Sequence, residues 1–99
     1  MDFLAGPLML AVAEAGHTGR FAIALDSIRN INFKDKDDEW SETALHKATK
    51  GGHKDIVQLL LGKGALTEVM NKDGNTPLHL AARGGYHTLM ELLLPRLKL

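Results

Sequence analysis

The chain has 99 residues, with 12 basic and 12 acidic side chains, no cysteine and 44% hydrophobic residues. This length suits a single domain, and the cancelling charges exclude a global field that would recruit nucleic acid or an anionic membrane. The absence of cysteine excludes a disulfide framework and any zinc site built on thiolates.

The N-terminal stretch from Asp2 to Ala13 is mostly apolar and ends in Ala-x-Ala. It has no basic n-region and carries an acidic residue at position 2, so it is predicted to be a core helix and not a signal peptide. No apolar segment reaches the roughly 18 residues that a membrane span requires. We therefore expect a soluble intracellular protein, cytoplasmic or nuclear.

Residues 7–30 contain a worn copy of a pattern that is clearer further along the chain. The segment Pro7–His17 falls on that pattern when Gly16 is matched to Gly52. A second helix is expected from about Thr18 to Ile28. Its buried face would carry apolar residues at helical spacing: Phe21, Ala22, Leu25 and Ile28. Because the polar residues that would hold a preceding turn are missing, we expect this unit to be an N-terminal cap.

Residues 43–64 form the best-preserved unit. The hydroxyl of Thr43 is placed to cap a first helix, which Gly51-Gly52 would end. A second helix is predicted from Lys54 to Gly62. The residues expected to be buried in the two helices are Ala44, Leu45, Ala48, Ile56, Val57, Leu59 and Leu60.

A second connection follows at residues 65–75, and residues 76–94 repeat the helix pair. The turn Asn71–Gly74 ends in a glycine suited to the left-handed conformation, and Pro77 lies in the first turn of a helix. The last helix, Tyr86–Leu94, ends before Pro95 and carries a full set of apolar residues, namely Leu89, Met90, Leu92, Leu93 and Leu94.

The two clear units repeat at a fixed spacing. Thr43, Leu45, His46, Ala48, Gly51, Gly52, Leu59, Leu60 and Leu61 recur as Thr76, Leu78, His79, Ala81, Gly84, Gly85, Leu92, Leu93 and Leu94. A period of about 33 residues with Thr-Pro-Leu-His-x-Ala is typical of ankyrin repeats. The chain therefore resembles an ankyrin-repeat protein. It is predicted to be an all-α solenoid occupying residues 1–99 as one domain, with repeat units at about 7–35, 36–69 and 70–99.

The resemblance implies that residues 31–42 form a β-turn finger, as in family members. This finger is a few residues long relative to the family, and Ser41 occupies the place of glycine, so its geometry is expected to be irregular. His46 and His79 are implied to bond across to a neighbouring loop. His17 and His53 follow the helix-ending glycines and are expected to be exposed.

Neither a metal site nor a catalytic site is predicted. Equivalent histidines on stacked helices lie about 10 Å apart, too far to share an ion. The segment Asp35–Glu39 resembles the start of an EF-hand, but Trp40 would fill the glycine position and His46 the glutamate position. No serine elbow or phosphate-binding glycine loop occurs. We expect no enzyme activity and no cofactor.

The predicted function is non-catalytic protein–protein interaction through a concave face and the fingers. Mapping the family's contact positions onto this sequence gives Asp37, Glu39, Trp40, Glu42, Lys47, Lys50, Met70, Lys72, Asp73, Asn75, Leu80 and Arg83. The acidic first finger favours a partner with a basic segment, while Trp40 is either an interface anchor or a residue packed on its neighbours. Two alternatives stay open: a targeting or regulatory part of a larger multidomain protein, and a self-assembling scaffold or weak homodimer joined through the last helix.

Overall fold

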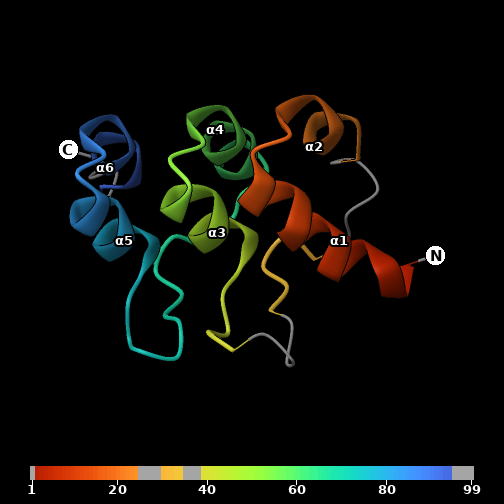
Figure 1. Ribbon diagram of the computed structural model, residues 1–99, viewed down its shortest axis with the longest axis horizontal. Coiled ribbons are helices and arrows are strands. Elements are labelled where there is room, and N and C mark those ends of the chain that lie inside the picture. Colours follow the sequence, from red (N-terminus) through yellow and green to blue (C-terminus); the bar gives the residue numbers. More distant parts are fainter. Residues whose placement is uncertain (1, 25–29, 35–38, 95–99) are drawn as a thin grey trace.

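The protein folds as two rows of short helices with loops extending from one side. A computed structural model describes residues 2–24, 30–34 and 39–94, with side chains from Met9 onward. In these ranges the helices are α1 (Asp2–Ala15), α2 (Thr18–Ala24), α3 (Ala44–Lys50), α4 (Lys54–Gly62), α5 (Pro77–Gly84) and α6 (His87–Leu93), and no strand occurs. In Figure 1, α1, α3 and α5 form one row and α2, α4 and α6 the other. This is the predicted all-α stack.

The first helices of the middle and last units begin at threonine caps, as predicted. The hydroxyls of Thr43 and Thr76 each accept the backbone N–H three residues on, from His46 and His79, at 3.4 Å. The imidazoles reach back and accept the backbone N–H of the same threonines, so each cap is reciprocal. Pro77 occupies the first turn of α5, where its missing N–H leaves no hydrogen bond unmade.

Glycines in the left-handed conformation end the first helix of each unit. Gly16, Gly52 and Gly85 have φ of 76°, 73° and 73°, and they are separated by 36 and 33 residues. The spacing between the first two of these glycines is therefore three residues greater than the spacing between the last two. Ser41 also adopts a positive φ, 52°, in the first finger, and the equivalent place in the second connection (residues 65–75, called the second finger below) is taken by Gly74 with φ 81°. Serine therefore substitutes for glycine in the turn at a conformational cost.

The core runs continuously through the three units. Leu45, Ile56, Val57 and Leu60 are at most 1% exposed, as predicted for the middle unit. Phe21, at 1%, is the buried residue of α2. The described residues that pack together in this core are Met9, Leu10, Ala13, Phe21, Ala44, Leu45, Ala48, Ile56, Val57, Leu60, Ala65, Ala81, Leu89 and Leu93.

Three expectations about burial need correction. Ala22 is exposed, because α2 turns Phe21 toward its neighbours and the next residue away from them, and Leu59 is only half-buried. Leu25 and Ile28 lie outside the described residues. The last helix is less bare than expected, since Leu89 and Leu93 are 2% and 4% exposed and Leu94 is 49% exposed. Met90 and Leu92 are half-buried.

No helix in the described ranges is long and apolar enough to span a bilayer.

Candidate interaction surface

Each unit after the first lays a ring over the helix end of the unit before it. His53 donates its Nε2–H to the carbonyl of Glu14 at 2.9 Å, and the Tyr86 hydroxyl reaches the carbonyl of Lys50 at 3.5 Å. The rings lie against Gly16 and Gly52, where an added Cβ would approach ring atoms to 2.5 Å and 3.0 Å.

These ring contacts correct one prediction. His53 was expected to be exposed, but it is half-buried, because its ring fills the space over the glycine of the preceding unit. His17, which has the equivalent position in the first unit, is exposed as predicted. The glycines at these helix ends therefore provide room for a ring as well as the left-handed backbone conformation.

His46 joins the middle unit to the second finger. The backbone N–H of Thr43 donates to Nδ1 of His46 at 3.2 Å, so the neutral ring carries its hydrogen on Nε2. That Nε2–H donates to the carbonyl of Asn75 at 3.0 Å, which confirms the predicted bond across to the neighbouring loop. Burial lowers the pKa of His46 from 6.5, and the Asn75 carbonyl and the Glu42 carboxylate oppose the shift only in part.

His79 makes the same contact with its own cap but no contact across to a loop. Its Nδ1 accepts the Thr76 N–H at 2.9 Å, and within the described chain its hydrogen bonds run only to that threonine. The predicted cross-loop bond is confirmed for His46, and among the described residues His79 makes no such bond.

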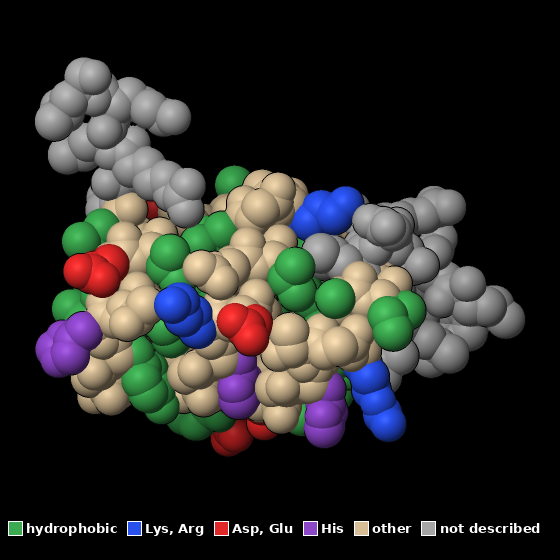
Figure 2. Space-filling model, turned by 90° about the horizontal axis from the view of Figure 1, so that it is seen from above, with side chains coloured by type: hydrophobic (Ala, Val, Ile, Leu, Met, Phe, Trp, Pro, Cys, Tyr) green, Lys and Arg blue, Asp and Glu red, His purple; other side chains and the backbone are tan. Residues whose placement is uncertain are grey.

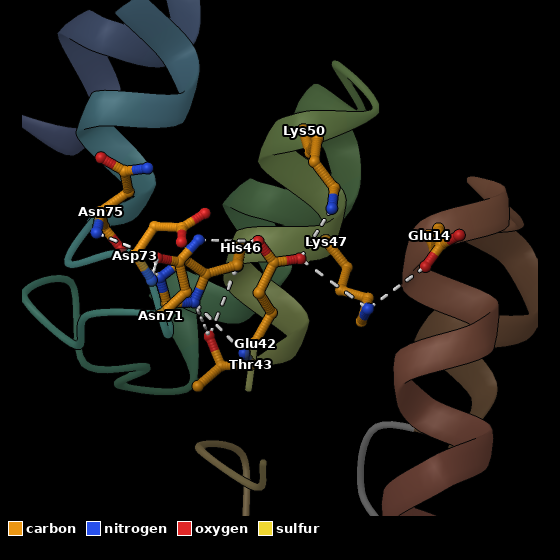
Figure 3. A network of polar contacts seen from close by, with 9 residues as sticks. All are labelled: Glu14, Glu42, Thr43, His46, Lys47, Lys50, Asn71, Asp73 and Asn75. Carbon is orange, nitrogen blue, oxygen red and sulfur yellow. Dashed lines mark hydrogen bonds and ion pairs between the residues drawn. The ribbon is translucent and has the colours of Figure 1, made fainter. Parts of the chain in front are cut away.

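A buried carboxylate connects the first helices to the second finger (Figure 3). Glu42, only 1% exposed, accepts from Lys50 Nζ at 2.8 Å and from Asn71 Nδ2 at 2.9 Å. Lys47 Nζ lies 3.8 Å from the same carboxylate and 3.4 Å from Glu14 in α1. The network links all three units, because these groups come from α1, α3 and the second finger.

Asn71 both joins the second finger to Glu42 and holds the backbone of that finger in place. Its Oδ1 accepts the backbone N–H groups of Asp73 and Asn75 at 3.0 Å each, while its amide group donates to Glu42. An asparagine side chain that bonds its own turn in this way holds the loop in one conformation. The second finger is therefore braced from inside by Asn71 and from the side by His46.

The two fingers are also bonded to each other. The backbone N–H of Lys72 donates to the carbonyl of Trp40 at 2.9 Å, and Lys34 Nζ donates to the carbonyl of Met70 at 2.8 Å. The N–H of Leu66 donates to Oδ1 of Asn32 at 2.8 Å. The side chains of Trp40 and Met70 are 41% and 57% exposed, so two large apolar groups stand on loops whose backbones are tied together.

A comparison with known protein families supports the architecture that the helices and fingers form. A family model for ankyrin repeats in three copies matches residues 8–98. The chain belongs to the ankyrin-repeat family. No curated protein matched the sequence. Ankyrin repeats are in general protein–protein interaction modules and are typically non-catalytic.

In this ankyrin-repeat protein, the predicted contact residues divide by burial. Seven are exposed: Glu39, Trp40, Lys50, Met70, Lys72, Asp73 and Arg83. Asn75 is half-buried, and Asp37 lies outside the described residues.

Three predicted contact residues are buried. Glu42 turns inward to bond Lys50 and Asn71, and Lys47, 7% exposed, lies between two carboxylates. Leu80 is 6% exposed, as suits an apolar side chain that can leave water. These three residues shape the repeat stack and do not contribute exposed contact area.

Sequence reasoning missed several parts of the finger surface of this ankyrin-repeat protein. Asn32 and Lys34 bond the second finger, and Leu66 is 56% exposed beside it. The only indication in the sequence was that Asn32 and Lys34, two side chains able to form hydrogen bonds, lie at the start of the connection 31–42. Among the described side chains, no cluster of three or more His, Cys, Asp or Glu is placed to hold a metal ion.

Proposed function

We propose that this protein binds a partner protein through a finger surface made of Glu39, Trp40, Met70, Lys72 and Asp73. The observation that carries the proposal is the exposure of Trp40 and Met70 on two loops that are hydrogen-bonded to each other. Tryptophan is one of the side chains enriched among the few residues that carry most of the binding energy of an interface. Methionine adapts its shape to a partner at low cost.

The bonding between the fingers favours binding by reducing the loss of freedom on association. A loop that is already ordered loses less conformational entropy when a partner settles on it. Here Asn71 and His46 fix the second finger, and the Lys72–Trp40 backbone bond fixes the first against it. On the side away from the fingers, formed by α2, α4 and α6, apolar, acidic, basic and histidine side chains are mixed, as the view from above in Figure 2 shows. The fingers are therefore the better candidate for a specific contact.

We further propose that the partner brings a basic segment to the first finger. Glu39 is exposed there, and the adjoining residues 35–38 add three aspartates and one lysine in the sequence. Glu42 takes no part in this attraction, because it is buried and already paired with Lys50. Reversing Glu39 to lysine should slow association and weaken its salt dependence, and unchanged kinetics would argue against the basic segment.

The test uses peptides selected from a random library for binding to the whole chain. Binding is then measured on the variants Trp40→Ala and Met70→Ala, with Ile23→Ala as the matched control. Ile23 is an apolar side chain 84% exposed on α2, in the row away from the fingers (Figure 1). We expect the two finger variants to lose affinity by about tenfold or more, the effect of an interface anchor, and the control to bind normally. Equal losses in all three, or losses only in the control, would refute the proposal.

A further inference from the structure

The turn of the second finger contains an aspartate followed by a glycine, and no other aspartate or asparagine in the sequence precedes a glycine. Asp73 and Gly74 are both exposed. The side-chain carboxyl carbon of an aspartate can be attacked by the backbone nitrogen of the next residue, which closes a succinimide ring. Glycine hinders this attack least because it has no Cβ, and no described atom lies within 4 Å of a Cβ built at Gly74. This peptide bond therefore lacks steric protection.

Asn71 accepts hydrogen bonds from both of the reacting residues. The N–H of Gly74 donates to the backbone carbonyl of Asn71 at 2.9 Å, and the N–H of Asp73 donates to Oδ1 of the same asparagine at 3.0 Å (Figure 3). The nitrogen of Gly74 must release its proton and turn toward the Asp73 side chain before it can attack. Because both steps require the bond to the Asn71 carbonyl to open, the folded turn slows the reaction.

The two asparagines of this finger are protected by bonds to other elements. The backbone N–H that follows the first asparagine belongs to Lys72 and donates to the carbonyl of Trp40 in the first finger at 2.9 Å. The N–H that follows the second belongs to Thr76 and donates to Nδ1 of His79 in α5 at 2.9 Å. The bond of Gly74 instead lies within the turn, which can open locally while the helices stay packed. The aspartate of the turn is therefore expected to react before either asparagine.

We propose that the Asp73–Gly74 peptide is a site of spontaneous isomerisation to isoaspartate and that Asn71 sets the rate. The bond between the Gly74 nitrogen and the side-chain carboxyl carbon forms, and one carboxylate oxygen leaves as hydroxide with the proton of that nitrogen. Hydroxide then adds to the main-chain carbonyl carbon of Asp73, and the bond from this carbon to the nitrogen breaks. The new hydroxyl gives its proton to the nitrogen, so the product has the same atoms and charge as the starting chain.

The product changes the shape of the finger without changing its net charge. The main chain now runs through Cβ of Asp73, so one extra carbon atom separates this residue from Gly74. The turn that the Gly74 N–H closes onto the Asn71 carbonyl becomes longer, and the free carboxylate lies closer to the backbone. Isomerisation is therefore a one-way change at the tip of the second finger, and the reaction itself requires no partner.

The test incubates the whole natural chain near neutral pH and measures isoaspartate by peptide mapping. The same chain unfolded in guanidinium chloride and the variant Asn71→Ala are incubated beside it. We expect isoaspartate to appear first at Asp73, and about fivefold or more faster in the unfolded chain, the ratio that corresponds to one hydrogen bond of average net strength. Asn71→Ala should approach the unfolded rate at Asp73 only. Asp55, exposed in α4, is the matched reference and should not accelerate.

Equal rates at Asp73 in the folded and the unfolded natural chain would show that the turn does not control the reaction and would overturn the proposal. Isoaspartate that forms first at another residue would overturn it as well. If Asn71→Ala unfolds the chain, Asp55 accelerates together with Asp73, and hydrogen exchange of the natural chain then decides. The Gly74 amide should exchange about fivefold or more slowly than in the unfolded chain, and an unprotected Gly74 amide would refute the role of Asn71.

Discussion

Replacing Glu42 by alanine should destabilise the protein more than any other single substitution of a charged side chain in the described structure. The substitution removes the acceptor of Lys50 Nζ at 2.8 Å and of Asn71 Nδ2 at 2.9 Å. It also leaves Lys47, whose side chain is 9% exposed, with Glu14 as its remaining carboxylate in that network. The second finger then loses the side-chain bond that joins Asn71 to the residue before α3.

The expected loss of stability depends on whether the partners of Glu42 can bond to water once the carboxylate is gone. Asn71 is 8% exposed, and a buried donor that loses its acceptor costs about 1–3 kcal/mol. Breaking a fully buried ion pair costs about 3–5 kcal/mol, but the side chain of Lys50 is 44% exposed, so water recovers part of that energy. We therefore expect the free energy of unfolding to fall by about 2–4 kcal/mol.

Urea unfolding followed by two probes measures this loss. Circular dichroism reports on the helices, and the fluorescence of Trp40, the sole tryptophan, reports on the fingers, because its carbonyl bonds the N–H of Lys72. Glu42→Gln should lose less than the alanine variant, since an amide oxygen still accepts from Asn71. In Glu42→Ala we expect the fluorescence transition to begin at lower urea than the helix transition.

The matched control is Glu39→Ala, which removes an exposed carboxylate from the same finger. Exposed substitutions of this kind change stability by no more than about 0.5 kcal/mol. If Glu42→Ala and Glu39→Ala have the same effect, the carboxylate of Glu42 does not brace the stack, and the reasoning from burial and distance is refuted.

Three other predictions concern single side chains. The pKa of His46 in the folded protein lies below the unfolded value of 6.5. The free energy of unfolding should therefore be constant above pH 6.5 and decrease as the pH falls from 6.5 to the folded pKa, by at most about 1.36 kcal/mol per pH unit. Urea titrations at several pH values measure this decrease, and the variant His46→Leu should not show it. Thr49→Val removes a buried hydroxyl that has no hydrogen-bond partner among the described groups, so a gain of about 1 kcal/mol is expected, and a loss would contradict the burial argument. Gly16→Ala should lower the melting temperature, because Gly16 has a φ of 76° and the new Cβ would meet the ring of His53. Gly19→Ala, in open space on α2, should raise the melting temperature. If Gly16→Ala raised it and Gly19→Ala lowered it, the ring contact would be excluded.

The local sequence was enough to place most of the fold. The 33-residue spacing and the cap pattern around Thr43 and Thr76 predicted where the first helices begin, and α4 runs from Lys54 to Gly62 as expected. Such signals are local, because a hydroxyl caps the helix that follows it and a glycine ends the helix before it. The loop residues Glu39, Trp40, Met70, Lys72 and Asp73 are exposed, as a contact surface requires, and their role in binding stays a prediction.

The failures at three polar residues, Glu42, Lys47 and His53, concern contacts between repeats. Lys47 was assigned to the surface from its position in one helix, but its burial depends on Glu14 of the repeat before. Glu42 was assigned to an acidic finger, but its partner Asn71 comes from the loop of the repeat after it. His53 looks exposed until the glycine of a neighbouring repeat is placed beneath it. A periodic sequence pattern predicts the helices within each repeat, but it does not predict which side chains of one repeat contact the next.

The chain of contacts between adjacent repeats has a mechanical consequence. The substantial helix contacts run from α1 to α3 and from α3 to α5 in one row, and from α2 to α4 and from α4 to α6 in the other. A load applied across the two ends is therefore carried in series through the middle repeat, as in a short spring. The bond from Tyr86 to the carbonyl of Lys50, at 3.5 Å, is longer than the bond from His53 to the carbonyl of Glu14, at 2.9 Å. We therefore expect a pulling force to separate the last repeat from the middle repeat first.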